Sequence, residues 1–312
     1  MTKMASVLAV AALIAAGGLA SVKAQPANSY AEPRLRDTWR DSWVESGVPR
    51  SAFFLGLGGS YNTSNFGTQN VYAVGTSDVF QAGVLTSSGS AAGPANVFIG
   101  SESNFAFSLQ GGYFQKFAGS NYLWGAKFSY SYLGGTASVR NALLPQAGSF
   151  TPTGSVTPVP FTGNAVVGSY QTSIIQQIAF VPFLGRAFER SFVYLGAGPT
   201  LSQVRTNLNG LVGFADINGA TTDVSGAPID FSSTNWVWGG AGMIGATYFF
   251  DPTWFLDVSY TVAVTGNQTA YFSGPFTNPN ATSGSTTVGT MVGNSTGKVV
   301  TQGVTVTINK IF

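Results

Sequence analysis

Two charged residues stand out because they lie within alternating segments that otherwise carry almost no charge. Lys127 and Asp257 each share their side-chain parity with serines, glutamine or glycine, so both are expected on the polar face of a strand. If that face is enclosed, the two charges must be paired. We expect an internal ion pair within a hydrogen-bonding network; the alternative is a gate or narrow selectivity filter. The expected network partners are Gln110, Ser129 and Ser259.

Other chemistry is limited by composition, because the chain contains no histidine and no cysteine. Histidine-dependent triads, His-based zinc sites, histidine proton switches and disulfides are therefore excluded. Asp216, Asp223 and Asp230 recur at seven-residue spacing and could bind Ca²⁺ weakly, but a solvated loop is the preferred interpretation. No catalytic residue, no metal and no cofactor are predicted.

The first 24 residues have the pattern of a secretory signal peptide. Lys3 precedes the short apolar run Val7–Ala16, and small residues precede an expected cleavage between Ala24 and Gln25. The apolar run is too short for a membrane-spanning helix, which needs about 20 residues. Cleavage would also remove Lys3 and Lys23, which takes the formal charge from +2 to about zero. An exported, nearly neutral protein with no nucleic-acid partner is expected.

Residues 25–50 form a charged segment that differs from the rest of the chain. Trp39 and Trp43 lie four residues apart, so one face of a short helix there could be apolar. The preferred interpretation is a periplasmic N-terminal segment. The alternative is a segment that packs into or against the mouth of the following domain.

From Ser51 to Phe312 the pattern has period two, which predicts strands. Short and long connections alternate along this region, as in up-and-down transmembrane barrels with short periplasmic turns and long extracellular loops. The long loops, about 63–103, 134–169, 206–234 and 265–297, are rich in Gly, Ser, Thr, Asn and Pro, so they are expected to be mobile. A hairpin within a loop would raise the strand count from eight to ten. The predicted strands are Ser51–Asn62, Asn104–Gln115, Tyr122–Leu133, Tyr170–Gly185, Ser191–Arg205, Asn235–Phe250, Trp254–Val264 and Lys298–Phe312.

The two faces of these strands differ in chemistry. In Tyr122–Leu133 the aromatic residues share one parity, whereas Lys127, Ser129 and Ser131 share the other. Charged residues are only 8% of the chain, against about a quarter in soluble domains. We therefore predict an all-β transmembrane barrel of eight antiparallel strands with a lipid-facing wall. A soluble β-sandwich is the alternative, but it would carry more surface charge.

Three segments resemble the small porin-family, opacity-protein and OmpA-like eight-stranded barrels of Gram-negative bacteria. They are Arg186–Gly198, Tyr248–Tyr260 and the terminal strand that ends at Phe312. The resemblance implies an outer-membrane protein that contacts lipid and that binds periplasmic chaperones during export. It also implies that the barrel-assembly machinery reads Phe312 as an assembly signal. Lys310 occupies a position where these strands prefer an aromatic residue, so that match is partial.

These observations favour a membrane-anchored structural or surface-interaction protein. A porin or small channel for small solutes is the alternative, since glycines on several strands thin the side chains of the wall. An enzyme is not expected, because the enzymes that this architecture resembles use a histidine. A monomer is expected, since a closed barrel has no free strand edge.

Overall fold

The computed structural model describes residues 47–217, 219–281 and 283–312. The predicted signal peptide and most of the charged segment 25–50 lie outside this part of the chain. Within it no helix could cross a membrane. The strands are β1 (Ser51–Asn65), β2 (Thr68–Gln81), β3 (Val84–Phe98), β4 (Ser101–Lys116), β5 (Tyr122–Pro152), β6 (Val159–Ala187), β7 (Ser191–Ile217), β8 (Ala220–Asp223), β9 (Ile229–Asp251), β10 (Trp254–Thr265), β11 (Gln268–Asn280), β12 (Ser285–Gly297) and β13 (Val300–Ile311).

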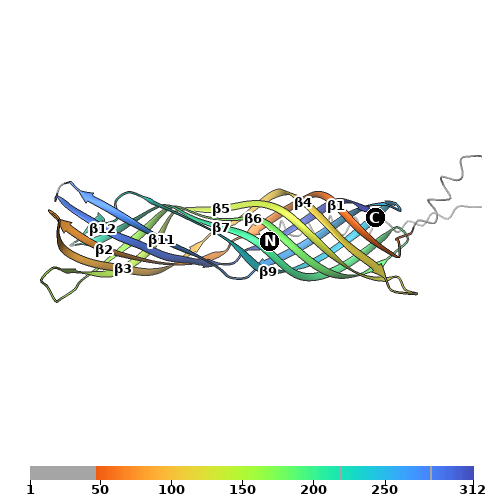
Figure 1. Cartoon of the computed structure of the whole chain (residues 1–312), viewed down its shortest axis with the longest axis horizontal. Helices are drawn as coiled ribbons and strands as arrows, with labels where there is room; N and C mark the ends of the chain where they lie inside the picture. Colours follow the sequence, from red (N-terminus) through yellow and green to blue (C-terminus); the bar gives the residue numbers. More distant parts are fainter. Residues whose placement is uncertain (1–46, 218, 282) are drawn as a thin grey trace, which may run out of the picture.

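Eight of these strands close into an antiparallel ring in the order β5, β4, β1, β13, β10, β9, β7 and β6, with β6 paired to β5 again. The first and last strands of the ring are directly paired, and Asn62 lies opposite Gly303. This confirms the predicted eight-stranded up-and-down barrel. We call this ring the basal tier; it occupies the end of the molecule where the C-terminus lies (Figure 1).

The prediction that the long connections are mobile loops is wrong, because they continue the barrel as strands. β2 and β3 form one hairpin and β11 and β12 another, while β5, β6, β7 and β9 simply extend beyond the basal tier. Together they form a second tube on the first, the distal tier (Figure 1). Threonine and valine favour pleated strands, and extended pairing satisfies backbone groups that a loop would leave to water.

The hairpin of β2 and β3 lies within the first long connection, where the sequence carries no clear hairpin signal. Its turn uses Ala82 at φ 50° and Gly83 at φ 81°. A two-residue turn with both central residues at positive φ matches the twist of a hairpin, but it is usually signalled by Asn-Gly or Asp-Gly. Because alanine occupies the first turn position, the sequence lacks this hairpin signal.

One junction of the distal tier lacks strand pairing among the described residues. β11 lies beside β9, but the sheet joins β11 only to β12. Side chains hold this junction instead: the rings of Phe231 in β9 and Phe272 in β11 are 5.9 Å apart. We call it the β9/β11 junction. Nearby, Asn278 Nδ2 of β11 donates to the backbone oxygen of Asp223 in β8 at 3.0 Å.

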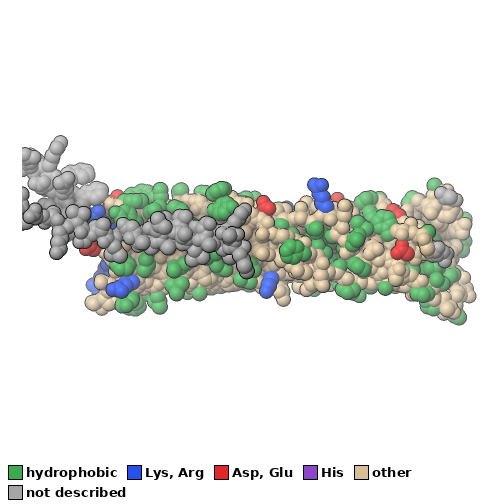
Figure 2. Space-filling model, turned by 180° about the vertical axis from the view of Figure 1, so that it is seen from behind, with side chains coloured by type: hydrophobic (Ala, Val, Ile, Leu, Met, Phe, Trp, Pro, Cys, Tyr) green, Lys and Arg blue, Asp and Glu red, His purple; other side chains and the backbone are tan. Residues whose placement is uncertain are grey.

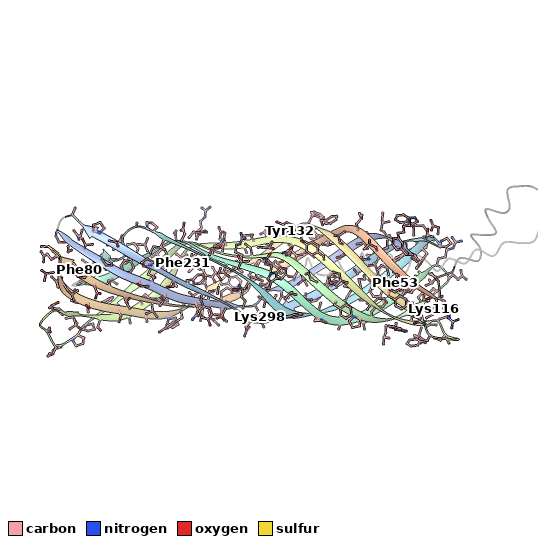
Figure 3. The ribbon with its side chains drawn as sticks, in the orientation of Figure 1. Phe53, Phe80, Lys116, Tyr132, Phe231 and Lys298 are labelled. Carbon is pink, nitrogen blue, oxygen red and sulfur yellow. The ribbon has the colours of Figure 1, made fainter. Side chains whose placement is uncertain are left out.

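The outer face of the basal tier is apolar between two belts of charge. Exposed aromatic and aliphatic side chains cover this tier, including Phe105, 84% exposed, and Trp238, 68% exposed. Figure 2 shows hydrophobic side chains crowded over it, and Figure 3 places Lys116 at its end and Lys298 near the middle of the molecule. Among the described residues, charges between the belts occur only at Lys127 and Asp257, which are buried inside. The belt at the end comprises Arg50, Lys116, Arg186, Glu189, Arg190, Asp251 and Lys310; the middle belt comprises Glu102, Arg140, Arg205 and Lys298.

The turns at the basal end are tied together by short polar contacts. Asp251 Oδ1 accepts from the backbone N–H groups of Thr253 and Trp254 at 2.7 and 2.9 Å, and the Thr253 bond holds the pKa of this carboxyl below its usual value. Val48 is 4% exposed and its N–H donates to Glu189 O at 3.1 Å. Residues 47–50, the described end of the charged segment, therefore pack against the barrel mouth.

Candidate functional site

The lumen of the basal tier is closed near its end by aromatic rings. These rings come from six strands and are each at most 5% exposed. Phe192 lies at their centre, with ring centroids 5.2 Å from Phe114, 6.4 Å from Phe183 and 6.2 Å from Phe249. Phe255 packs between Phe249 and Phe54, at 5.0 and 5.4 Å. We call this cluster the aromatic plug; it consists of Phe54, Phe114, Phe183, Phe192, Phe249 and Phe255.

Glycines on neighbouring strands make room for these rings. A Cβ at Gly112 would lie 2.7 Å from Phe54 Cζ, and one at Gly125 would lie 2.4 Å from Phe183 Cζ. Real Cβ atoms do not approach other atoms so closely. At Gly112 and Gly125, two of the glycines that could have thinned the wall of a pore, aromatic side chains therefore occupy the space.

A polar layer lies next to the plug and contains the two predicted lumen charges. Lys127 and Asp257 are 2% and 1% exposed, and Lys127 Nζ lies 2.6 Å from Asp257 Oδ2. Tyr194 OH donates to Asp257 Oδ1 at 2.8 Å and also accepts from Lys127, whose ammonium lies 4.7 Å from the Tyr194 ring centre. Four strands, β5, β7, β10 and β4, supply this network.

Gln110 connects this pair to the terminal strand. Its Nε2 donates to Asp257 Oδ2 at 3.0 Å and to Asn309 Oδ1 at 2.8 Å. Asn309 in turn donates to the side chain of Thr307 at 3.1 Å. Of the other expected partners, Ser259 joins the network through a hydrogen bond with Tyr194, whereas Tyr194 and Asn309 were not expected. Buried charges that are paired and also hydrogen-bonded avoid the cost of an isolated ion.

The plug and the polar layer both lie in the lumen of the basal tier, where each ring and each charge contacts a partner from another strand. Small eight-stranded barrels are generally filled by their side chains in this way. The arrangement can hold strands together.

The three aspartates at seven-residue spacing, for which weak Ca²⁺ binding was the alternative to a solvated loop, are not gathered into one site. Asp216 accepts from Thr221, Asp223 accepts from the N–H groups of Ser225 and Gly226, and Asp230 accepts from the Gly210 N–H. Each therefore shapes its own turn. Within the described residues no group of three acidic, His or Cys side chains could hold a metal ion.

Phe312 lies at the basal rim on the outer face. It is 73% exposed, and its N–H donates to Phe53 O at 3.0 Å, which joins the last residue to the first strand. Lys310 reaches between two aromatic rings, 5.6 Å from Trp254 and 5.9 Å from Phe312. The lysine in the place of an aromatic residue is thus accommodated by cation–π contacts.

A closed ring of eight antiparallel strands, an apolar outer band between belts of charge and a filled interior together define the architecture of an outer-membrane β-barrel. No family model matches the chain, and no curated protein matches it. Its fold is similar to solved structures of this architecture, and at these identities the likeness concerns the fold alone.

Three of these solved structures show how far the chain resembles them in sequence identity, coverage and TM-score. The outer membrane protein OprG from Pseudomonas aeruginosa is 10% identical, with 82% of this chain and 98% of that chain covered and a TM-score of 0.32. Neisserial surface protein A is 12% identical, with 80% and 99% covered and a TM-score of 0.27. The Escherichia coli outer membrane protease OmpT is 10% identical, with 82% and 97% covered and a TM-score of 0.25.

Proposed function

We propose that this protein is a non-conducting outer-membrane barrel that anchors a rigid surface extension. The observation that carries the proposal is the filled basal lumen, where the aromatic plug and the Lys127–Asp257 pair occupy the cross-section. The functional face is then the distal tier, which is a paired β-structure and not a set of independent loops.

The placement in a membrane follows from the outer face of the basal tier. Exposed Phe53 and Leu57 would be unfavourable in water, but they match a hydrocarbon core. Along one strand the two charged belts are 12 to 15 positions apart, from Lys298 to Lys310, from Glu102 to Lys116 and from Arg190 to Arg205. This leaves room for the roughly 9 to 11 tilted residues that a bilayer requires. Outer-membrane lipid is therefore the first proposed partner.

The export, assembly and oligomeric state of the protein can be proposed as well. We propose that an N-terminal signal peptide directs export, that periplasmic chaperones receive the chain, and that the barrel-assembly machinery recognises the terminal strand with Phe312. The ring has no free edge in the basal tier, so a monomer is sufficient. An enzymatic role is not proposed, because the polar layer is sealed and the chain has no histidine.

The proposal predicts that the folded protein is electrically silent in a planar bilayer. Two forms should be compared, one beginning at Gln25 and one beginning at Gly47, which keeps the buried Val48. Correct folding is checked by the heat-modifiable shift of barrels on a gel. We expect no stable conductance from either form, since both retain the aromatic plug.

Stable, reproducible conductance of the form beginning at Gln25 would contradict the proposal and favour the porin alternative. Conductance only of the form beginning at Gly47 would contradict it as well, because it would show that residues 25–46, and not the aromatic plug, block the lumen.

A further inference from the structure

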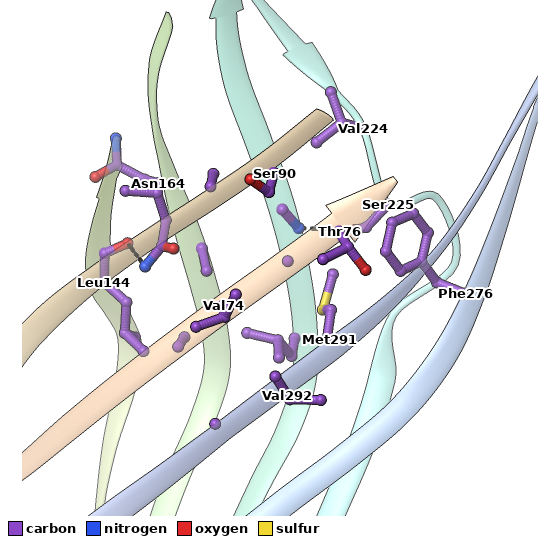
Figure 4. A pocket seen from close by; sticks show the side chains of 18 of the residues that line it. Val74, Thr76, Ser90, Leu144, Asn164, Val224, Ser225, Phe276, Met291 and Val292 are labelled. Atoms are coloured by element: carbon purple, nitrogen blue, oxygen red, sulfur yellow. Dashed lines mark hydrogen bonds between the residues drawn. The ribbon is translucent and has the colours of Figure 1, made fainter. Parts of the chain in front are cut away.

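We propose that the distal tier contains a binding site for a small, uncharged hydrocarbon. A cavity of about 100 Å³ lies inside this tier, between β2, β3, β5, β6, β7, β9, β11 and β12 (Figure 4). None of its lining residues is charged. This excludes ionic ligands, because the wall has no charge to pair with them.

The cavity is unfilled space, unlike the lumen of the basal tier. Gly75 lines it, and a Cβ added there would meet nothing within 4 Å. A Cβ at Gly213 would meet Met291 Cε at 3.6 Å, an ordinary contact. By contrast, Gly112 and Gly125 of the basal tier adjoin rings that leave no room for a Cβ. The distal tier therefore holds a space for a ligand where the basal tier holds a plug.

Two polar side chains of the wall, those of Gln146 and Ser225, already have partners in the protein. Gln146 Nε2 donates to the backbone oxygens of Leu144 and Pro145 at 3.3 and 3.1 Å. Ser225 Oγ accepts from the Gly213 N–H at 2.7 Å. None of the described buried polar side-chain atoms that lack a hydrogen bond belongs to a lining residue. Since apolar cavities of this kind stay dry and take up small hydrocarbons, a polar ligand is disfavoured.

The side chains that surround the space favour an aromatic or branched hydrocarbon. Phe231, Phe272, Phe276 and Met291 present ring edges, ring faces and a thioether, which make favourable contacts with aromatic groups. Figure 4 shows Phe276 and Met291 on neighbouring strands beside Val292. Two of the rings, Phe231 and Phe272, also close the β9/β11 junction. Movement there breaks no strand pairing, so it provides a route by which a ligand can enter.

This inference goes beyond the proposed surface role and does not depend on it, because the cavity requires no continuous pore. It can be tested with toluene as the probe and with methionine methyl groups labelled with ¹³C. From Gln25 onward the chain contains Met243 and Met291 as its only methionines. Met291 lines the cavity, whereas Met243 is packed beside the aromatic plug and serves as an internal reference.

Titration of the folded barrel in detergent should shift the Met291 methyl resonance to saturation and leave the Met243 resonance unchanged. Gly75→Leu fills the cavity and should weaken toluene binding at least about tenfold, equivalent to roughly 1.4 kcal/mol. Gly242→Leu is the matched control, because its Cβ also meets nothing within 4 Å but lies on the exposed outer face. It should bind toluene like the original chain.

Gly213→Val provides a second cavity-filling variant if Gly75→Leu does not give the heat-modifiable shift of a folded barrel. Unchanged binding in a folded cavity-filling variant would overturn the proposal. Parallel, non-saturating shifts of Met243 and Met291 would also overturn it, since they would report partition into detergent and not a site.

Discussion

Replacing Asp257 with Asn is expected to lower the free energy of unfolding by about 3–5 kcal/mol, the usual cost of leaving a buried charge unpaired. Lys127 is 2% exposed and has Asp257 as its ion-pair partner at 2.6 Å. An amide keeps the shape but removes the negative charge, so the ammonium remains buried beside a neutral group. Urea titration of the protein in detergent micelles, followed by tryptophan fluorescence, measures the change.

Two comparisons separate this effect from a general loss of packing. Lys127→Met combined with Asp257→Leu removes both charges and should recover most of the lost stability, because well-packed apolar pairs often replace buried ion pairs without cost. Asp251→Asn changes a carboxylate in the exposed basal turn and should cost much less. A double variant less stable than Asp257→Asn would contradict the assignment of the loss to an unpaired lysine.

Replacing Phe192 with Ala is expected to lower the free energy of unfolding by a similar amount, about 3–5 kcal/mol. Phe192 is 2% exposed and contacts the rings of Phe114, Phe183, Tyr194 and Phe249. These rings come from four other positions in the barrel wall, so the wall cannot collapse into the space that is left. The same urea titration measures this change.

The control for this variant is Phe105→Ala on the outer face. Phe105 is 84% exposed and pairs with Tyr61 at 4.9 Å, outside the lumen. Its truncation leaves no cavity, so the loss should stay below about 1 kcal/mol. Equal losses for Phe105→Ala and Phe192→Ala would show that the aromatic plug is no better packed than the surface.

The basal tier could be predicted from the sequence because alternation of apolar and polar residues is a local signal. In β5, Tyr122 and Phe128 face outward, whereas Lys127 is buried, as their parity indicates. The polar parity also placed Lys127 and Asp257 inside the barrel. Their pairing was expected from the cost of a buried unpaired charge, but its geometry could not be derived, since it depends on the ring that brings β5 and β10 to opposite parts of one lumen.

The aromatic plug and the distal tier could not be predicted, for two different reasons. Phe114 and Phe255 occupy strand positions whose side chains face the lumen. In the sequence, an apolar residue at such a position is only an exception to the alternation of polar and apolar faces. The distal hairpins are rich in Gly, Ser and Thr, residues that also form loops. Their pairing depends on long-range partners such as Ser285 opposite Gln81, which composition cannot reveal.

The most direct test of the closed lumen is thiol labelling of Ser259→Cys, in a chain that has no other cysteine. Ser259 is 3% exposed within the polar layer, and Ser155→Cys in an exposed turn is the reference. A water-soluble maleimide should label Ser155→Cys rapidly and leave Ser259→Cys unlabelled until the barrel is unfolded. Labelling of both cysteines at similar rates in the folded barrel would contradict a closed lumen.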